Sequence, residues 1–134
     1  MRPAQTLLAL AAVALLAVVT ALAVRAQTRN TSSSQLHPVG RYLALAGSSG
    51  PAAFGRHTAC GTVIGPPTEG VAQPTLPCGA RIFIQFRGRR VLTEVIDRGP
   101  YTPGRQLDLT DALARMLGLS GVQQVYWSYA RAGS

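Results

Sequence analysis

The sequence predicts a mainly β domain, a barrel or a sandwich, that carries one short helix. Short runs rich in β-branched and aromatic residues recur along the chain, and Gly and Pro separate them. Only one segment has a helical pattern with a start and a stop signal. The expected strands are residues 42–46, 61–64, 81–86, 90–96 and 122–129.

The clearest strand pair is a hairpin. In residues 81–86 the side chains of Ile82, Ile84 and Phe86 fall on one face, as expected for a half-buried strand. An arginine-rich turn follows and leads directly into residues 90–96. We therefore predict that these two runs pair antiparallel.

The helix is expected at residues 111–117. Thr110 precedes it and can cap the first turn, while Gly118 ends it. Its apolar face, which we expect to pack against the barrel, consists of Leu113, Met116 and Leu117.

The length and composition of the chain limit the classes of function that it can have. The chain has 134 residues, 13 basic against 5 acidic side chains and a formal charge of +8, and every basic residue is Arg. One small domain fits this length, which leaves no room for a nucleotide-binding domain beside a substrate domain. Large cofactor enzymes are therefore excluded.

The first residues of the chain are expected to be an export signal. Residues 1–26 contain an unbroken apolar run and then small residues near a cleavage position, which is typical of a secretory signal peptide. An uncleaved N-terminal anchor is the alternative, and only then do we expect contact with a membrane. Residues 27–40 are predicted to be a flexible linker, and residues 41–130 the barrel domain. The domain is thus expected outside the cytoplasm, extracellular, periplasmic or associated with the cell wall.

Cys60 and Cys78 are the two cysteines of the chain. In an exported domain such a pair predicts a disulfide. The alternative is half of a metal site, but there is no second cysteine pair, and His37 and His57 stand apart. We expect no metal.

The most informative stretch surrounds Asp97. This residue ends an apolar run and is followed by Arg98 and a Gly-Pro turn, which places a carboxylate at the rim of the predicted barrel. Asp108 lies between Leu107 and Leu109 and is expected to point away from the face that those two residues bury.

Three pieces of the sequence in this order resemble a known family, the double-psi β-barrel domain of rare lipoprotein A, which is related to the barrel of expansins. The resemblance covers residues 41–129, nearly all of the expected exported part. The three pieces are Thr58-Ala59-Cys60-Gly61, then Gly70-Val71-Ala72 with Thr75-Leu76-Pro77-Cys78-Gly79, then residues 95–121.

The resemblance implies a six-stranded double-psi β-barrel with a groove that binds polysaccharide, chiefly peptidoglycan. Some members are lytic transglycosylases, in which one acid protonates the leaving oxygen and the sugar's own hydroxyl closes a 1,6-anhydro ring. Asp97 matches the family's acidic residue and is the candidate catalytic residue. No cofactor is implied. The candidate substrate-binding residues are Gln73, Thr75, Arg98, Tyr101 and Asp108.

The chain departs from the pattern of active members at three places. Gln73 stands where they carry a His, and an amide does not titrate near neutral pH. A second acid found upstream of that His has only Glu69 as a loose counterpart. The first strand has Leu43-Ala44-Leu45 where the family often shows an aromatic residue, so an aromatic surface for a sugar is missing there.

The sequence allows two roles for Asp97, one structural and one catalytic. The carboxylate either accepts backbone N–H groups or pairs with an Arg, and stays ionised, or it serves as a general acid. Asp108 is expected to brace the barrel, and His57 to be a solvated or hydrogen-bonding residue.

The basic charge points to an acidic partner. The arginines are scattered apart from the 87–90 turn and are not interleaved with aromatic residues, so nucleic acid is not expected. Outside the cytoplasm, acidic cell-wall polysaccharide fits this charge. In the last run Val125, Trp127 and Tyr129 share one face. These aromatic residues either close the barrel or stack on sugars.

Three functions follow as hypotheses. The first is an exported module that binds peptidoglycan glycan strands with reduced or no catalysis. The second is a lytic transglycosylase that cleaves the MurNAc-GlcNAc bond with Asp97 as sole general acid and base. The third is a barrel held at the membrane by its leader and bound to a protein partner.

Overall fold

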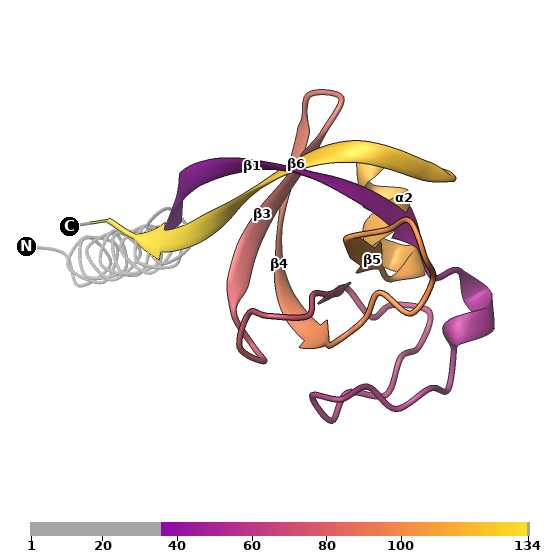
Figure 1. The fold of residues 1–134 in the computed structure, drawn as a ribbon. Coiled ribbons are helices and arrows are strands. Elements are labelled where there is room, and N and C mark those ends of the chain that lie inside the picture. Colours follow the sequence, from indigo (N-terminus) through magenta and orange to yellow (C-terminus); the bar gives the residue numbers. More distant parts are fainter. Residues whose placement is uncertain (1–35, 134) are drawn as a thin grey trace, which may run out of the picture. The chain divides into compact units, whose positions relative to one another are not determined.

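The computed structural model describes residues 36–133, and the predicted signal peptide and the linker residues 27–35 lie outside them. Six strands and two short helices make up the domain (Figure 1). Their order is β1 (Leu36–Ser48), the 3₁₀ turn η1 (Pro51–Ala53), β2 (Val71–Ala72), β3 (Arg81–Phe86), β4 (Arg89–Asp97), β5 (Leu107–Leu109), α2 (Asp111–Leu117) and β6 (Val122–Ala132).

The strands close into a barrel in the order β1-β5-β2-β4-β3-β6. Two of the pairs are parallel, β1 with β5 and β2 with β4, and each joins strands that are distant in sequence. The predicted hairpin is confirmed, with Ile84 opposite Val91 and Ile82 opposite Thr93. The predicted six-stranded barrel with one short α-helix is therefore confirmed.

The barrel interior is filled by alternating side chains. Ile82 and Ile84 of β3 are fully buried, and Val95 of β4 and Val125 of β6 lie in the same core. At the tip of the β3–β4 hairpin Arg87 and Gly88 both have positive φ, which turns the chain sharply between the two strands.

Two predicted boundaries differ from the observed ones. Residues 61–64 do not form a strand, and within them Val63 makes only an isolated bridge to His57. Strand β1 begins at Leu36, so residues 36–40 of the predicted linker lie in that strand. Residues 61–64 bond to the short irregular segment 55–58, for example through the N–H of Ile64 to the carbonyl of Arg56, which is not part of the barrel sheet. Strand β1, in contrast, pairs with β5 in the barrel.

Strands β2 and β5 were not among the predicted runs. They have two and three residues, too short to show alternation, and every residue in them is buried. They pair with each other, with Ala72 opposite Asp108, and so both belong to the barrel wall. Tertiary pairing, and not local pattern, makes these segments strands.

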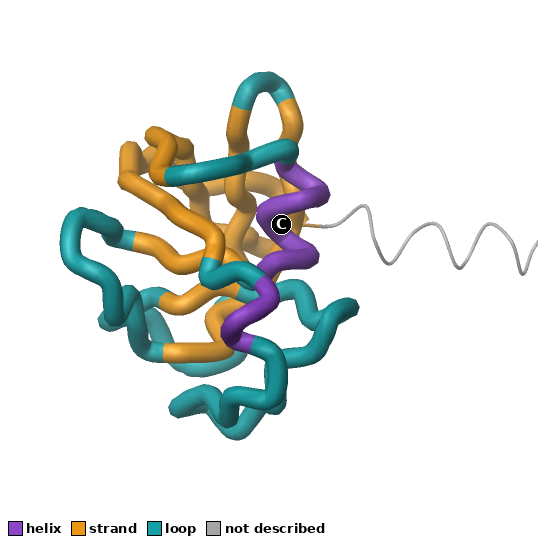
Figure 2. Tube along the Cα trace, turned by 90° about the vertical axis from the view of Figure 1, so that its right-hand side faces the viewer, coloured by secondary structure: helices purple, strands orange, loops and turns teal. Residues whose placement is uncertain are grey.

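Helix α2 starts and ends as predicted. Thr110 caps it by accepting a hydrogen bond from the N–H of Leu113, and Gly118 ends it with φ of 68°. The helix contacts β4, and Figure 2 shows the helices in purple beside the orange strands. The expected apolar face is partly wrong, because Met116 is 43% exposed and the smaller Ala114 is buried beside Leu113 and Leu117.

Cys60 and Cys78 form a disulfide, as predicted. It ties the irregular segment after η1 to the residues just before β3. Within residues 36–133 no helix is long and apolar enough to cross a membrane.

Reduction of this disulfide should destabilise the domain. The bond closes a loop between residues 18 positions apart, and the loop-entropy account gives about 3 kcal/mol for a loop of this size. Urea unfolding of the oxidised protein and of the Cys60→Ser/Cys78→Ser variant should show the variant unfolding at a markedly lower urea concentration. Equal midpoints would contradict the expectation.

Candidate functional site

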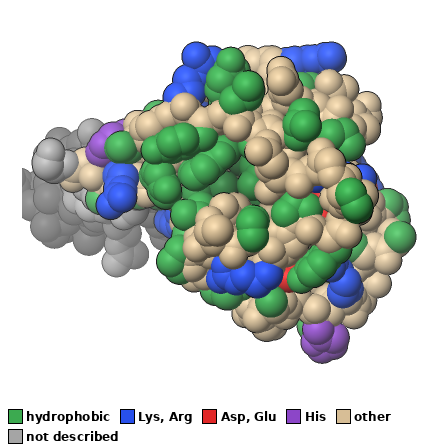
Figure 3. All heavy atoms as spheres, viewed as in Figure 1, with side chains coloured by type: hydrophobic (Ala, Val, Ile, Leu, Met, Phe, Trp, Pro, Cys, Tyr) green, Lys and Arg blue, Asp and Glu red, His purple; other side chains and the backbone are tan. Residues whose placement is uncertain are grey.

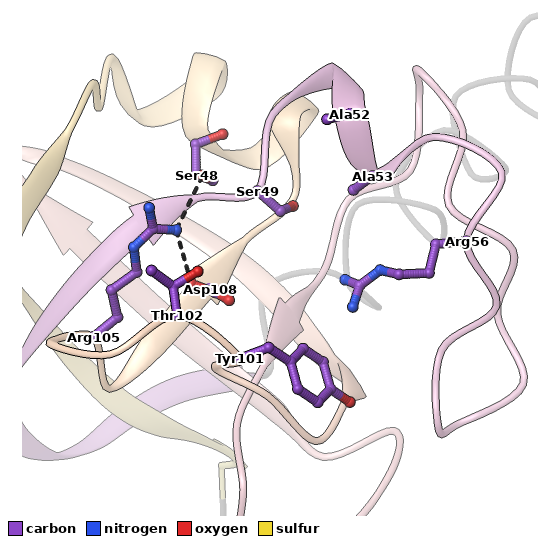
Figure 4. Close-up of a pocket in the computed structure, with 9 residues that line it drawn as sticks. All are labelled: Ser48, Ser49, Ala52, Ala53, Arg56, Tyr101, Thr102, Arg105 and Asp108. Carbon is purple, nitrogen blue, oxygen red and sulfur yellow. Dashed lines mark hydrogen bonds and ion pairs between the residues drawn. The ribbon is translucent and has the colours of Figure 1, made fainter.

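An open cavity of about 310 Å³ lies beside the turn that follows β4 (Figure 4). In Figure 4 the side chains of Arg56 and Tyr101 point toward one another on one side of it, and Arg105 lies on the other. The lining residues are Ser48, Ser49, Ala52, Ala53, Arg56, Tyr101, Thr102, Arg105 and Asp108.

A second cavity of about 400 Å³ adjoins the first, because Arg105 lines both. It lies among β1, the segment after β2 and the loop before β5. We call the two together the groove. The residues that line this second cavity are Leu43, Ala44, Gln73, Pro74, Thr75, Pro100, Arg105, Gln106, Leu107 and Trp127.

Asp97 lies at the end of β4, is 2% exposed and contacts Arg56 and Tyr101, two residues that line the first cavity. Its Oδ1 accepts three hydrogen bonds, from the backbone N–H of Ala59 at 3.0 Å, from that of Arg98 at 2.8 Å and from the Tyr101 hydroxyl at 3.1 Å. Its buried Oδ2 accepts no hydrogen bond and faces Arg56 Nη2 in an ion pair at 3.4 Å.

These contacts keep the carboxylate ionised. Burial by itself raises the pKa of Asp97, but the N–H groups of Ala59 and Arg98, the Tyr101 hydroxyl and the Arg56 charge together outweigh burial and hold it below 3.8. The same bond to the carboxylate, with burial and the negative charge, raises the pKa of the Tyr101 hydroxyl. At neutral pH Asp97 is therefore an anion and Tyr101 a neutral donor.

Arg56 covers this carboxylate. Its guanidinium carbon lies 5.3 Å from the centre of the Tyr101 ring, and its side chain is 39% exposed. The sequence reasoning did not single out Arg56, because it is far from Asp97 along the chain and belongs to no local pattern.

Arg98 lines neither cavity of the groove. Its Nη1 donates to the carbonyl oxygens of Gln73 and Leu76, and its Nη2 lies 3.0 Å from the sulfur of Cys78. The side chain thus holds the segment after β2 against the disulfide. A contact between Arg98 and substrate stays a prediction, and its observed partners are structural.

Asp108 and Arg105 form an ion pair at 3.1 Å, and Arg105 also donates to the carbonyl of Ser48 at 3.2 Å. Asp108 is 8% exposed, and its neighbours Leu107 and Leu109 are also buried. Those two belong to the hydrophobic core, whereas Asp108 lines the first cavity, which agrees with the expectation that it points away from the face they bury. A Cβ on Gly47 would lie only 2.6 Å from Arg105 Nε, so glycine there lets the guanidinium reach Asp108. The pair joins β1 to β5 and also lines the first cavity.

Gln73 and Thr75 line the second cavity, as neighbours in one tight turn. The Gln73 side-chain oxygen accepts from the N–H groups of Thr75 and Leu76, and its amide nitrogen donates to the Thr75 hydroxyl at 3.0 Å. The backbone N–H of Gln73 donates to the carbonyl of Asp97 at 3.0 Å. Gln73, which the resemblance matches to the family's His, is therefore bonded to Asp97 through the backbone, and its side chain bonds within its own turn.

The structure thus gathers four of the predicted residues around one groove: Tyr101 and Asp108 at the first cavity, and Gln73 and Thr75 at the second. Asp97 lines neither cavity and contacts Arg56 and Tyr101 at the first. The sequence reasoning did not assign Arg56, Arg105 and Gln106 to the site. Within residues 36–133 no three His, Cys, Asp or Glu side chains are grouped as metal ligands.

Comparisons with known proteins agree with this architecture. Residues 47–129 match the lytic transglycolase family of double-psi β-barrel domains. The endolytic peptidoglycan transglycosylase RlpA of Yersinia pestis is 41% identical over 85 residues, which are 62% of this chain and 24% of that protein. This chain thus spans about a quarter of the length of that relative.

Two solved structures share the fold. The Streptomyces papain inhibitor superposes with a TM-score of 0.53 at 22% identity, over 70% of this chain and 97% of that one. A mutant expansin of Clavibacter michiganensis in complex with cellohexaose superposes with a TM-score of 0.55 at 18% identity, over 71% of this chain and 54% of that one. With the family match over most of the described domain, these likenesses lead to one conclusion: the chain belongs to the lytic transglycolase family of double-psi β-barrel domains.

Proposed function

We propose that this protein is exported to the cell wall, where its barrel binds peptidoglycan glycan strands along the groove without cleaving them. The observation that carries the proposal is the state of Asp97, a buried carboxylate with three hydrogen-bond donors on one oxygen and an arginine at the other. The relatives named endolytic peptidoglycan transglycosylases support the glycan as ligand.

Cleavage by the lytic route begins with proton donation. The acid must give its proton to the leaving glycosidic oxygen and then take one from the sugar hydroxyl that closes the anhydro ring. A carboxyl whose pKa lies below its ordinary value of 3.8 holds no proton at neutral pH. The first half of the reaction then has no donor at Asp97.

The remaining groups in the groove do not replace that donor. Among the described residues that line the two cavities, the acidic side chain is Asp108, which is paired with Arg105. Gln73 carries an amide where active members carry an imidazole. The Tyr101 hydroxyl already donates to Asp97, and its pKa is raised.

The groove suits binding to a polar chain. Hydroxyl, amide and guanidinium groups line it, at Ser49, Thr75, Gln106, Arg56 and Arg105. Such groups bond to sugar hydroxyls, N-acetyl groups and carboxylates. Without the expected signal peptide, residues 27–134 carry 11 Arg and 5 acidic side chains, and this net charge of +6 adds a long-range attraction to an acidic wall.

The first prediction compares cleavage with binding. After incubation of purified peptidoglycan with residues 27–134, we expect no 1,6-anhydro sugar ends by mass spectrometry and co-sedimentation of the protein with the wall. The Asp97→Asn variant should give the same digest. Glu94→Gln, an exposed acid on the same strand, is the matched control. Anhydro ends that appear with the wild type and with Glu94→Gln but vanish with Asp97→Asn would overturn the proposal.

A lytic transglycosylase is the second candidate, and one observation favours it. Asp97 Oδ2 is buried and accepts no hydrogen bond, so if Arg56 moves away its free lone pair can take a proton, and the protonated oxygen can then give that proton to a substrate. In this case Gln73→His would supply the family's missing group, and we expect it to increase the release of anhydro ends. If binding alone is the function, Gln73→His releases none.

The second prediction concerns stability against pH. Because the folded-state pKa of Asp97 lies below its ordinary value, the carboxylate stabilises the fold fully above pH 3.8, and this contribution is lost as the pH falls through the folded pKa. The free energy of unfolding of the wild type should therefore drop more steeply on acidification than that of Asp97→Asn. At pH 7 Asp97→Asn should itself cost about 2 kcal/mol.

Urea unfolding between neutral pH and the acid limit of folding measures both effects. Glu94→Gln should keep the wild-type slope, because this exposed acid has no ion pair among the described residues. Parallel curves for the wild type and Asp97→Asn would contradict the assignment of Asp97 as a stabilising anion.

A further inference from the structure

The second cavity contains an aromatic wall that the first strand does not supply. Trp127 lies on β6 opposite Ile84 of β3, on the same face of its strand as the buried Val125. Unlike Val125 it is only partly buried, and its side chain lines the cavity. The indole therefore has one part in the core and another in the groove.

Neighbouring rings hold the indole in place. The ring of Tyr42 lies 4.6 Å from it, centroid to centroid, and that of Tyr129 lies at 5.2 Å and nearly perpendicular. Aromatic packing of this kind fixes ring orientation. Figure 3 shows hydrophobic side chains gathered on the face where β1 and β6 cross. The indole is thus preorganised, which lowers the cost of ordering it around a ligand.

Polar groups face this aromatic wall across the cavity. Thr75, Arg105 and Gln106 line the same cavity as Trp127. The Gln106 side-chain oxygen accepts from the N–H of Leu45 at 2.8 Å, which fixes the amide at the edge of β1. An apolar plate with hydrogen-bonding groups around it is the arrangement that recognises a pyranose ring, whose C–H face is apolar and whose rim carries hydroxyl groups.

We infer that Trp127 is a sugar-stacking residue, and that the second cavity is a subsite for one ring of a β-linked glycan strand. Leu43 and Ala44, where the family's first strand often has an aromatic residue, line the same cavity as the indole. The last strand thus provides the stacking surface that the first strand lacks. The inference rests on the proposed function and adds the subsite and its contact.

The chain offers a direct probe of this contact. Trp127 is the one tryptophan of the 134 residues, so its fluorescence, excited where tyrosine does not absorb, reports on this cavity alone. Titration with soluble glycan strands freed of stem peptides should produce a saturable change in emission. Trp127→Leu should bind these strands about tenfold or more weakly, and Trp127→Phe should fall between the two.

Tyr126→Leu is the matched control. Tyr126 is the adjacent aromatic residue, 37% exposed, with Arg41 stacked on its ring at 3.7 Å, and it lines neither cavity. This variant should bind glycan strands as the wild type does. Thermal unfolding of each variant separates loss of binding from loss of fold. If Trp127→Leu does not fold, the emission change of the wild type and the affinity of Trp127→Phe for the glycan strands test the subsite instead.

The outcomes separate the two proposals. Unchanged emission and equal affinity of the wild type and the folded Trp127 variants, with binding to the wall intact, would refute the subsite and leave the proposed function standing. Failure of the wild type to bind either the strands or the wall would refute both. An equal loss in Tyr126→Leu would also refute the specific role of Trp127.

Discussion

The hydrogen-bonded carboxylate of Asp97 is the interaction on which the groove depends. Through one oxygen it joins the N–H of Ala59 beside the disulfide, the N–H of Arg98 at the turn after β4 and the hydroxyl of Tyr101. Through the other it pairs with Arg56. Two segments that are far apart in sequence, residues 56–59 and 97–101, therefore meet at one buried anion. Loss of the carboxylate would leave these buried donors without an acceptor. The free-energy cost of an unpaired buried donor is larger than the net stabilisation that its hydrogen bond provides.

The same arrangement limits the chemistry. Donors that fasten the loops also favour the ionised form, and the ionised form cannot begin acid catalysis. Members of a single fold family can differ in this way without a change of architecture, because function depends on the site and not on the fold. Gln73 also has a structural role in this chain, because its side-chain oxygen accepts hydrogen bonds from the backbone of its own turn.

How far the sequence predicted the structure depended on how local each signal was. The β3–β4 hairpin and the capped helix were predicted because alternation and capping are visible within a few residues. Strands β2 and β5 were missed, since only pairing with distant strands defines them. Asp97 was found through its motif, whereas Arg56 was missed because its approach to Asp97 is purely tertiary. The sequence did not decide whether Trp127 lies in the core or in the groove. In the structure it packs against the core and also lines the second cavity.

The most direct test of the account is a carboxyl-carbon NMR titration of Asp97, with and without glycan strands. We expect a pKa below 3.8 in the free protein, and still below it when the strand is bound, because the donors to Oδ1 come from the fold itself. A pKa that rises toward neutrality on binding would contradict the account. It would show a carboxyl that becomes a proton donor in the complex, as a catalyst requires.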